Sequence, residues 1–354
     1  MAVIFLLVDA GLFRLFSLGA DWAPLWTAGK LAWTDPPKVY DFDLITSLQA
    51  PLLGPVDHRP FIYPPSALLF IAPFALLPFW ASLTLFSFAS APGFAQVSRP
   101  LGADRALLLV APPVLLCAIA GQPTLLVAAL VTAALSRLGT RDASAGVLLG
   151  IAFAIKPTLL LLAPVALLFG GHWRAMVFST LTLALIAGLS VSLLGIDAWS
   201  HWLLALPGFQ QLIADEPTLI SSAITPYSAA MRLGLDPQLA MGSGALVAIP
   251  LLALTFARIQ EIAVRLVILL GGGLLVAPYS MNYELALLAP AVLSQPLTSP
   301  RRLILPTIWS ASLCSGASLL GLLAVYTWAA NRVLRSLRSR SDERCMESGV
   351  HVRA

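Results

Sequence analysis

Apolar residues run along this chain in long continuous stretches, separated by short breaks that contain charged residues, proline or glycine. A membrane-crossing helix needs about 20 predominantly apolar residues, whereas a transmembrane β-barrel would show alternation with a period of two. The continuous runs therefore predict helices. Candidate spans lie near residues 2–19, 64–95, 103–120, 123–137, 143–156, 158–170, 175–195, 240–257, 266–281, 284–298 and 303–331.

Two of these runs need interpretation. The run 64–95 contains Pro73 and Pro78, so it forms either one long kinked helix or more than one span. The run 303–331 has Ser315 and Gly316 in its middle, which predicts two short helices in a hairpin. Counting 64–95 as one crossing predicts an all-α fold, a polytopic transmembrane helical bundle of about 12 helices with a long first outer loop.

Composition agrees with this pattern. Residues AVILMFWYC make up 58% of the 354 residues, only 11% are charged, and the mean hydropathy is +0.87. Soluble domains carry about 25% charged residues. A water-soluble globule, a disordered chain, a coiled coil and a nucleic-acid-binding domain are excluded, because none of them could keep this much apolar surface from water.

Arginine distribution predicts the orientation. With the N-terminus in the cytoplasm, 15 of the 18 arginines fall on the inner side, as the positive-inside rule expects. The predicted outer segments 20–63 and 196–239 are rich in Asp instead. We therefore expect one membrane-embedded domain over 1–331 and a basic cytoplasmic tail over 332–354, which would bind anionic lipid headgroups.

The N-terminal run lacks a basic region ahead of it and an A-x-A-like cleavage site, so we expect a retained first span. Asp9 lies inside that run, and an intramembrane carboxylate is a candidate functional residue. Its alternative role is a polar contact with another helix, or a position near the inner face if the true N-terminus is longer.

The outer segment 20–63 is long for a loop, and long loops in compact proteins are usually functional or disordered. It carries many aromatic residues, which argue for interfacial helices at the headgroup level. We expect the chemistry here. The aromatic residues are Trp22, Trp26, Trp33, Tyr40, Phe42, Phe61 and Tyr63.

Asp21 begins this segment. A partly desolvated carboxylate at the membrane boundary can act as a general base, but an Asp at this position also caps a helix well. Composition alone favours the cap. Lys156, before Pro157, is one of three lysines in the chain. Buried, it would need a carboxylate or another anion, such as a lipid-linked phosphate; otherwise it would extend to the headgroups.

Two outer turns offer further polar groups. Gln122, in the Gly121-Gln122-Pro123 turn, could hydrogen-bond a sugar hydroxyl, although such a tripeptide is also a plain turn. Asn282, Tyr283 and Glu284 form a second turn between Pro278 and Pro290. Glu284 at a helix start suits the helix dipole, so we read it as structural.

No other motif points to a cofactor. The four histidines are scattered and the three cysteines have no metal or disulfide spacing, so we expect no metal site. No nucleotide-binding glycine motif and no G-x-S-x-G hydrolase context stand out. We expect no cofactor; a transferase here would take its donor substrate from the membrane.

Four segments in order resemble glycosyltransferase family 87. They are DWAPLWTAGKLA…VYD, FIYPPSALLFIAPFALLPFWAS, AGQPTLLVAAL and ASAGVLLGIAFAIKPTLLLLAPVALL, and the resemblance covers roughly residues 18–295. That family contains polyprenol-phosphate-mannose-dependent α-mannosyltransferases of the GT-C superfamily. The resemblance implies an inverting hexosyltransferase of the bacterial inner membrane, multi-pass, with its active site on the outer, periplasmic face.

The resemblance also implies roles. Asp21 matches the base that acts on the acceptor hydroxyl. Lys156, with Arg59, would meet the donor phosphate, while Gln122 and Asn282 would orient sugar hydroxyls. Asn282 stands where many members have His, which leaves the role of its turn open. The correspondence extends to Trp26, Gly29, Tyr40, Asp41, Tyr63 and Tyr283, the last two as substrate-binding residues.

The implied partners are a polyprenyl-phosphate-sugar donor, a glycolipid or polysaccharide acceptor and membrane lipids, with no nucleic acid. Two other classes stay open. A transporter or flippase would need paired broken helices and midplane charges, of which only Asp9 and Lys156 come close. A catalytically inactive envelope scaffold would keep the fold without the base.

Overall fold

The computed structural model describes residues 18–54, 59–295, 300–314 and 317–347. Within these ranges the chain is helical and contains no strand, apart from one isolated antiparallel bridge between Ala223 and Met281. The predicted all-α class is confirmed. Asp9 and nearly all of the predicted span 2–19 lie outside the described residues.

The helices follow one another closely, with short 3₁₀ turns and one π-helical turn (η5) between them. In order they are α3 (Trp22–Ala32), η1 (Pro36–Tyr40), α4 (Phe42–Leu53), α5 (Pro65–Ile71), η2 (Phe74–Leu76), α6 (Phe79–Val97), η3 (Arg99–Leu101), α7 (Arg105–Val110), α8 (Pro112–Ala120), α9 (Thr124–Leu135), α10 (Asp142–Ile155), η4 (Pro157–Leu160), α11 (Ala163–Phe169), α12 (Trp173–Leu194), α13 (Ile196–Asp215), α14 (Pro217–Ser222), α15 (Pro226–Arg232), α16 (Pro237–Arg258), α17 (Ile262–Leu266), η5 (Val267–Gly271), α18 (Gly272–Val276), η6 (Asn282–Leu288), α19 (Ala289–Leu293), α20 (Pro300–Cys314) and α21 (Ser318–Glu347).

Two of the described helices, α12 and α16, are each long and apolar enough to cross a membrane alone. On α12 the leucines at positions 181, 185, 189 and 193 recur every four residues and are all about half or more exposed, so they form one apolar stripe. An exposed apolar stripe of this kind is suited to lipid contact. The larger count of about 12 crossings stays a prediction.

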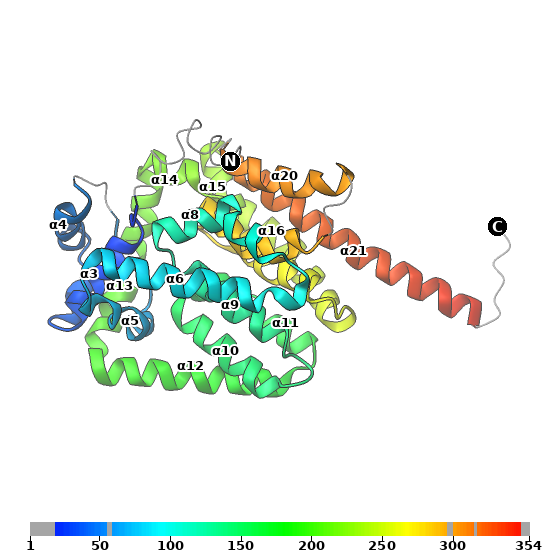
Figure 1. Ribbon diagram of the computed structural model, residues 1–354, viewed down its shortest axis with the longest axis horizontal. Helices are drawn as coiled ribbons and strands as arrows, with labels where there is room; N and C mark the ends of the chain where they lie inside the picture. The colour runs from blue at the N-terminus through cyan, green and yellow to red at the C-terminus, as the bar shows by residue number, and fades with distance from the viewer. Residues whose placement is uncertain (1–17, 55–58, 296–299, 315–316, 348–354) are drawn as a thin grey trace.

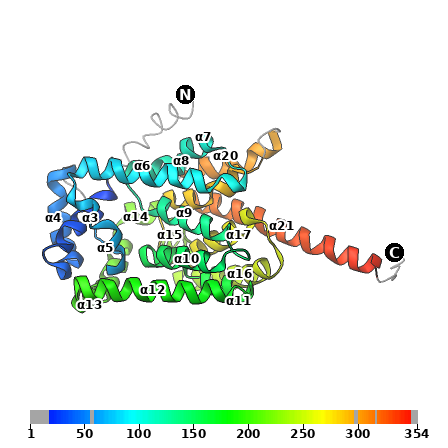
Figure 2. The same cartoon turned by 60° about the horizontal axis from the view of Figure 1, so that its bottom comes forward.

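The elements are arranged along one long axis (Figure 1). Helices α3, α4 and α13 gather at one end, on the left in that view, while α21 projects beyond the other end. Figure 2 shows α6 and α12 along opposite sides of the body, with α9 and α10 between them. Helix α6 packs on α9, α9 on α10, and α10 on α12, so these four helices form a continuous layer.

Small residues allow the closest of these contacts. Gly146 and Gly150 lie four residues apart on α10, where a Cβ atom would meet backbone oxygens of Ala175 and Ser179 on α12. Residues at this spacing share one helix face. Their missing side chains let the two backbones approach closely, as small residues do in apolar helix pairs.

The run 64–95 divides into α5, η2 and α6, with Pro73 and Pro78 standing before η2 and α6. Helix α5 has only 7 residues, which at 1.5 Å per residue is about 10 Å, too short to span a bilayer. Helix α6 has 19 residues. Neither piece is among the helices that are long and apolar enough to cross a membrane alone, so the count of this run as a single crossing stays a prediction.

In the described parts of segment 20–63 the chain is mostly helical, and its aromatic residues contact the rest of the protein. The rings of Trp22 and Phe86 stack with centroids 4.3 Å apart, and the Tyr40 hydroxyl donates to the Tyr63 carbonyl at 3.0 Å. Trp202 of α13 donates to the Ile62 carbonyl at 3.1 Å. These contacts hold the segment as helices α3, η1 and α4 against the body.

Candidate active site

Asp21 lies at the start of α3, but its side chain makes no capping hydrogen bond, so the capping interpretation is wrong. Its Oδ1 atom accepts a hydrogen bond from Arg59 Nη1 at 3.3 Å. Its backbone N–H donates to the Ala120 carbonyl at 3.1 Å. The carboxylate is thus held beside the turn that carries Gln122, with Oδ2 buried and without a partner in the described part of the chain.

That turn depends on Gly121, which has a φ of 78°. A Cβ atom at this position would lie 2.5 Å from Cβ of Trp22, so both the backbone conformation and the close approach require glycine. The turn joins α8 to α9 and lies against Trp22, the first residue of α3. It therefore positions Asp21 and Gln122 in one place.

Gln122 is buried between two tyrosines. The Tyr63 hydroxyl donates to Gln122 Oε1 at 3.1 Å, and Gln122 Nε2 donates to the Tyr283 hydroxyl at 2.7 Å. Burial raises the pKa of Tyr63 to about 12, so the hydroxyl keeps the proton that it donates at neutral pH. The two tyrosine hydroxyls therefore hold the Gln122 side chain in place between them.

Lys156 follows the end of α10, where Pro157 prevents the helix from continuing. Its ammonium group forms an ion pair with Glu284 Oε1 and donates to Thr124 Oγ1 at 3.2 Å. It also lies 5.7 Å from the centre of the Tyr63 ring. Lys156 is therefore an interior residue with a carboxylate partner, and the expectation that it extends to the headgroups is wrong.

Short helices recess this network within the body. Helices α9 and α10 have 12 and 14 residues, which corresponds to about 18 Å and 21 Å, less than the roughly 30 Å of a bilayer core. Gln122 and Lys156 stand at the ends of these two helices. Gln122 is only 6% exposed and the Lys156 side chain only 12%, so both lie in the interior of the protein.

Three acceptor oxygens in this region are buried and make no hydrogen bond to any described residue: Asp21 Oδ2, Asn282 Oδ1 and Glu284 Oε2. The Asn282 and Glu284 side chains belong to one 3₁₀ turn, η6, and are almost fully buried. Buried polar atoms nearly always have partners, and these oxygens can only accept, given an ionised carboxylate. The arrangement is suited to a ligand that donates several hydrogen bonds.

All seven residues singled out in the sequence meet in this region, because Asp21, Arg59, Tyr63, Gln122, Lys156, Asn282 and Tyr283 are linked by the contacts above or adjoin them. The charges of Asp21 and Glu284 both act on the hydroxyls of Tyr63, Tyr279 and Tyr283. The two carboxylates therefore share one neighbourhood.

Three residues of this neighbourhood were not predicted to take part: Glu284, Thr124 and Tyr279. Glu284 was read as a helix-dipole residue, but it is the partner of Lys156. A signal existed, since a lone lysine between apolar helices needs a buried carboxylate and Glu284 occupies another break between apolar runs. Two residues that match the family pattern make contacts elsewhere: Trp26 donates to the Leu77 carbonyl, and Asp41 caps α4.

The family model of glycosyltransferase family 87 matches residues 61–278 of the chain. That range includes Tyr63, Gln122 and Lys156, and covers more than half of the chain. This match identifies the chain as a glycosyltransferase, and its described part is all-helical apart from turns and loops. The chain belongs to glycosyltransferase family 87. No curated protein sequence and no solved structure matches the chain.

Proposed function

We propose that this glycosyltransferase is embedded in the bacterial inner membrane and moves a hexose, mannose in the first instance, from polyprenyl phosphate. The acceptor would be an envelope glycolipid or polysaccharide at the outer face. The family supports a sugar donor and an acceptor. The apolar helices α12 and α16 and the short helices that recess the site support a donor that enters from the lipid.

One observation carries the proposal, namely the three buried acceptor oxygens of Asp21, Asn282 and Glu284. A sugar hydroxyl is a hydrogen-bond donor as well as an acceptor, so a hexose could satisfy all three. Leaving them unpaired costs about 1–3 kcal/mol each. An apolar or purely anionic ligand would not supply the missing donors.

Asp21 acts as the base in this proposal. Its carboxylate takes the proton of the acceptor hydroxyl while that oxygen forms a bond to the anomeric carbon. The bond between the anomeric carbon and the phosphate oxygen breaks, and its electron pair leaves with the polyprenyl phosphate. Attack opposite the leaving group inverts the anomeric configuration. Arg59 forms an ion pair with Asp21 at 3.3 Å. In this proposal its guanidinium group also stabilises the charge of the departing phosphate.

Lys156 and Glu284 have different roles in this proposal. Because Glu284 neutralises Lys156, we assign the main contact with the phosphate to Arg59 and a secondary one to Lys156. Lys156 holds Glu284 Oε1, which leaves Oε2 to accept from a sugar hydroxyl. Gln122 and Asn282 would orient further hydroxyls, and Tyr63 and Tyr283 hold Gln122 in place.

The test is a transfer assay with protein in lipid nanodiscs, radiolabelled polyprenyl-phosphate-mannose and cell-envelope lipids as the acceptor pool. We expect a new labelled glycolipid that disappears with Asp21→Asn and persists with Asp35→Asn, a surface aspartate of the same segment. Failure to transfer mannose or any other lipid-linked hexose would contradict the proposal. Movement of the donor across vesicles without covalent change would favour a transporter.

A further inference from the structure

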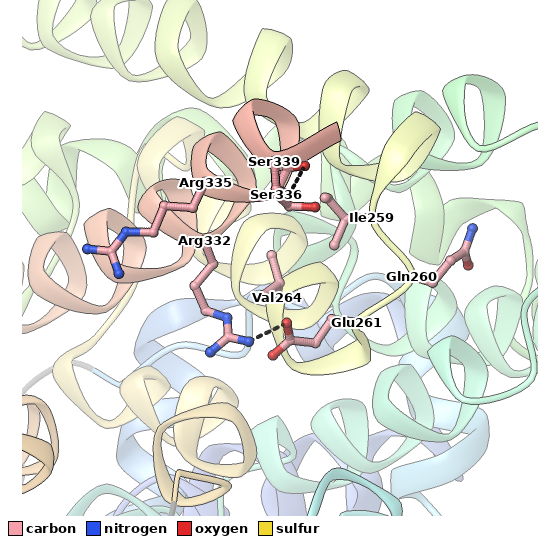
Figure 3. A pocket seen from close by; sticks show the side chains of 8 residues that line it. All are labelled: Ile259, Gln260, Glu261, Val264, Arg332, Arg335, Ser336 and Ser339. Atoms are coloured by element: carbon pink, nitrogen blue, oxygen red, sulfur yellow. Dashed lines mark hydrogen bonds and ion pairs between the residues drawn. The ribbon is translucent and has the colours of Figure 1, made fainter. Parts of the chain in front are cut away.

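A pocket of about 560 Å³ lies far from the site described above, between the Ile259–Glu261 segment and α21. It is lined by Ile259, Gln260, Glu261, Val264, Arg332, Arg335, Ser336 and Ser339 (Figure 3). The α16–α17 connection and the basic half of α21 form its walls. This volume is in the range of small-molecule sites.

The electrostatic environment of the pocket is positive. Arg332 Nη2 and Glu261 Oε2 form an ion pair at 2.9 Å, and Glu261 is the only acidic residue in segments 256–265 and 328–339, which carry five arginines. One of these, Arg265, is only 2% exposed and donates to the carbonyls of Ile259 and Phe256. Its charge has no carboxylate partner among the described residues and lies behind the wall of the pocket.

Several donors in the pocket also lack a protein partner. Arg335 and the Ser336 hydroxyl make no hydrogen bond or ion pair within the described ranges, and Arg332 uses only one of its guanidinium nitrogens on Glu261. In Figure 3 the Arg332 side chain extends toward Glu261, whereas the Arg335 side chain extends from α21 away from Ser336 and Ser339. Two guanidinium groups and a hydroxyl are the groups that bind phosphate oxygens in proteins.

The composition of α21 indicates where this pocket lies relative to the membrane. Residues 318–331 of the helix are mostly apolar, and arginines begin at position 332. Trp328 lies at this change of composition, with the Arg332 guanidinium 5.8 Å from its ring. Tryptophan next to arginine at the end of an apolar stretch marks the plane of the lipid headgroups, on the side that the arginine distribution assigns to the cytoplasm.

We infer that this pocket binds a phosphate ester at the cytoplasmic headgroup plane, with Arg335, Ser336 and Arg332 as its ligands. The phosphate could belong to an anionic phospholipid of the inner leaflet or to a soluble phosphate compound, and the chemistry of recognition is the same. Such a site would tie α21 to the α16–α17 connection, since its walls come from both.

The experiment measures lipid retention by native mass spectrometry and the thermal midpoint of the full chain in nanodiscs. One arm compares phosphatidylglycerol with phosphatidylcholine, and the other adds inorganic phosphate to phosphatidylcholine nanodiscs. The variants are Arg335→Gln, alone and with Ser336→Ala. The control is Arg99→Gln, an exposed arginine outside the pocket.

We expect the wild type to retain phosphatidylglycerol in preference to phosphatidylcholine, and Arg335→Gln to weaken this preference about fivefold while Arg99→Gln leaves it unchanged. A rise of the midpoint with inorganic phosphate but without lipid preference, lost in Arg335→Gln, would assign the site to a soluble phosphate compound. Absence of both effects, or an equal loss with Arg99→Gln, would overturn the inference. Sugar transfer does not enter this test.

Discussion

Lys156 and Glu284, 128 positions apart in the sequence, form an ion pair in the interior, and Glu284 keeps its second oxygen free of any described partner. The side chains are only 12% and 3% exposed. Taking two charges out of water is costly, so the pair is a poor device for stability alone. Its geometry instead presents a fixed acceptor oxygen in the active-site region.

This relationship predicts different outcomes for stability and for activity. Lys156→Met leaves the Glu284 charge buried without its partner and should destabilise the protein by about 3–5 kcal/mol. The double variant Lys156→Met/Glu284→Met removes both charges and the acceptor oxygens, and should recover most of that stability. If Glu284 accepts from the sugar, transfer stays low in the double variant; thermal unfolding and the transfer assay together separate the two effects.

The exposed ion pair between Arg332 and Glu261 can be compared with the buried pair between Lys156 and Glu284. Their side chains are 44% and 38% exposed, and exposed ion pairs contribute about 0–1 kcal/mol. In phosphatidylcholine nanodiscs without added phosphate, Arg332→Gln should therefore leave the midpoint nearly unchanged. A double variant at Lys156 and Glu284 with restored stability and wild-type transfer would show that the buried pair is purely structural.

Asp21→Asn is the most direct test of the base. Asparagine keeps the size of the side chain and can still contact Arg59, but it cannot take a proton from the acceptor. Loss of general-base catalysis costs about 10²–10⁴-fold in rate, so kcat should fall by that range while donor binding and the thermal midpoint stay close to wild type. Near-normal turnover would place the base on another residue.

The sequence predicts secondary structure correctly where local composition determines it. Apolar runs predict helices, and aromatic residues predict an ordered segment over 20–63. The sequence leaves the role of Asp21 open, because both a helix cap and a catalytic base can be an aspartate at this position. The absence of a capping hydrogen bond contradicts the capping interpretation, while the role of Asp21 as a base stays a prediction.

Glu284 shows where local reasoning fails. The helix-dipole argument uses only the neighbouring residues, whereas its ion pair with Lys156 depends on how η6 packs near the end of α10. Similarly, the two prolines in 64–95 indicate breaks but not which piece is long enough to cross. The change of composition at residue 332 is also not a structural boundary, since α21 continues from Ser318 to Glu347.

Tyr63→Phe tests the support of Gln122. The variant removes the donor to Gln122 Oε1, whose side chain is buried, and a hydrogen bond of this kind contributes about 0.5–1.5 kcal/mol. We expect kcat/KM for the lipid-linked sugar to fall up to about tenfold. Steady-state kinetics would measure this change.

Tyr326→Phe is the matched control. Tyr326 is also buried, but its hydroxyl has no partner within the described residues. Removing an unpaired buried hydroxyl should leave stability unchanged or slightly higher. Equal effects of the two substitutions would mean that the bond between Tyr63 and Gln122 does not matter for transfer.

Gly121→Ala tests whether the turn beneath α3 positions the site. At φ 78° a residue with a Cβ atom is strained, and that atom would lie 2.5 Å from Trp22 Cβ and 2.7 Å from Leu83 Cδ1. We expect a destabilisation of more than about 2 kcal/mol together with loss of transfer, because Asp21 is hydrogen-bonded to Ala120 in the same turn. Gly93→Ala, inside α6 and near its C-terminal end, has no atom within 4 Å of the new Cβ. It should instead stabilise the helix by about 0.5–1 kcal/mol and leave transfer unchanged. Thermal midpoints and transfer rates of the two variants would check this contrast, and a Gly121→Ala protein with wild-type values of both would show that the turn tolerates a side chain.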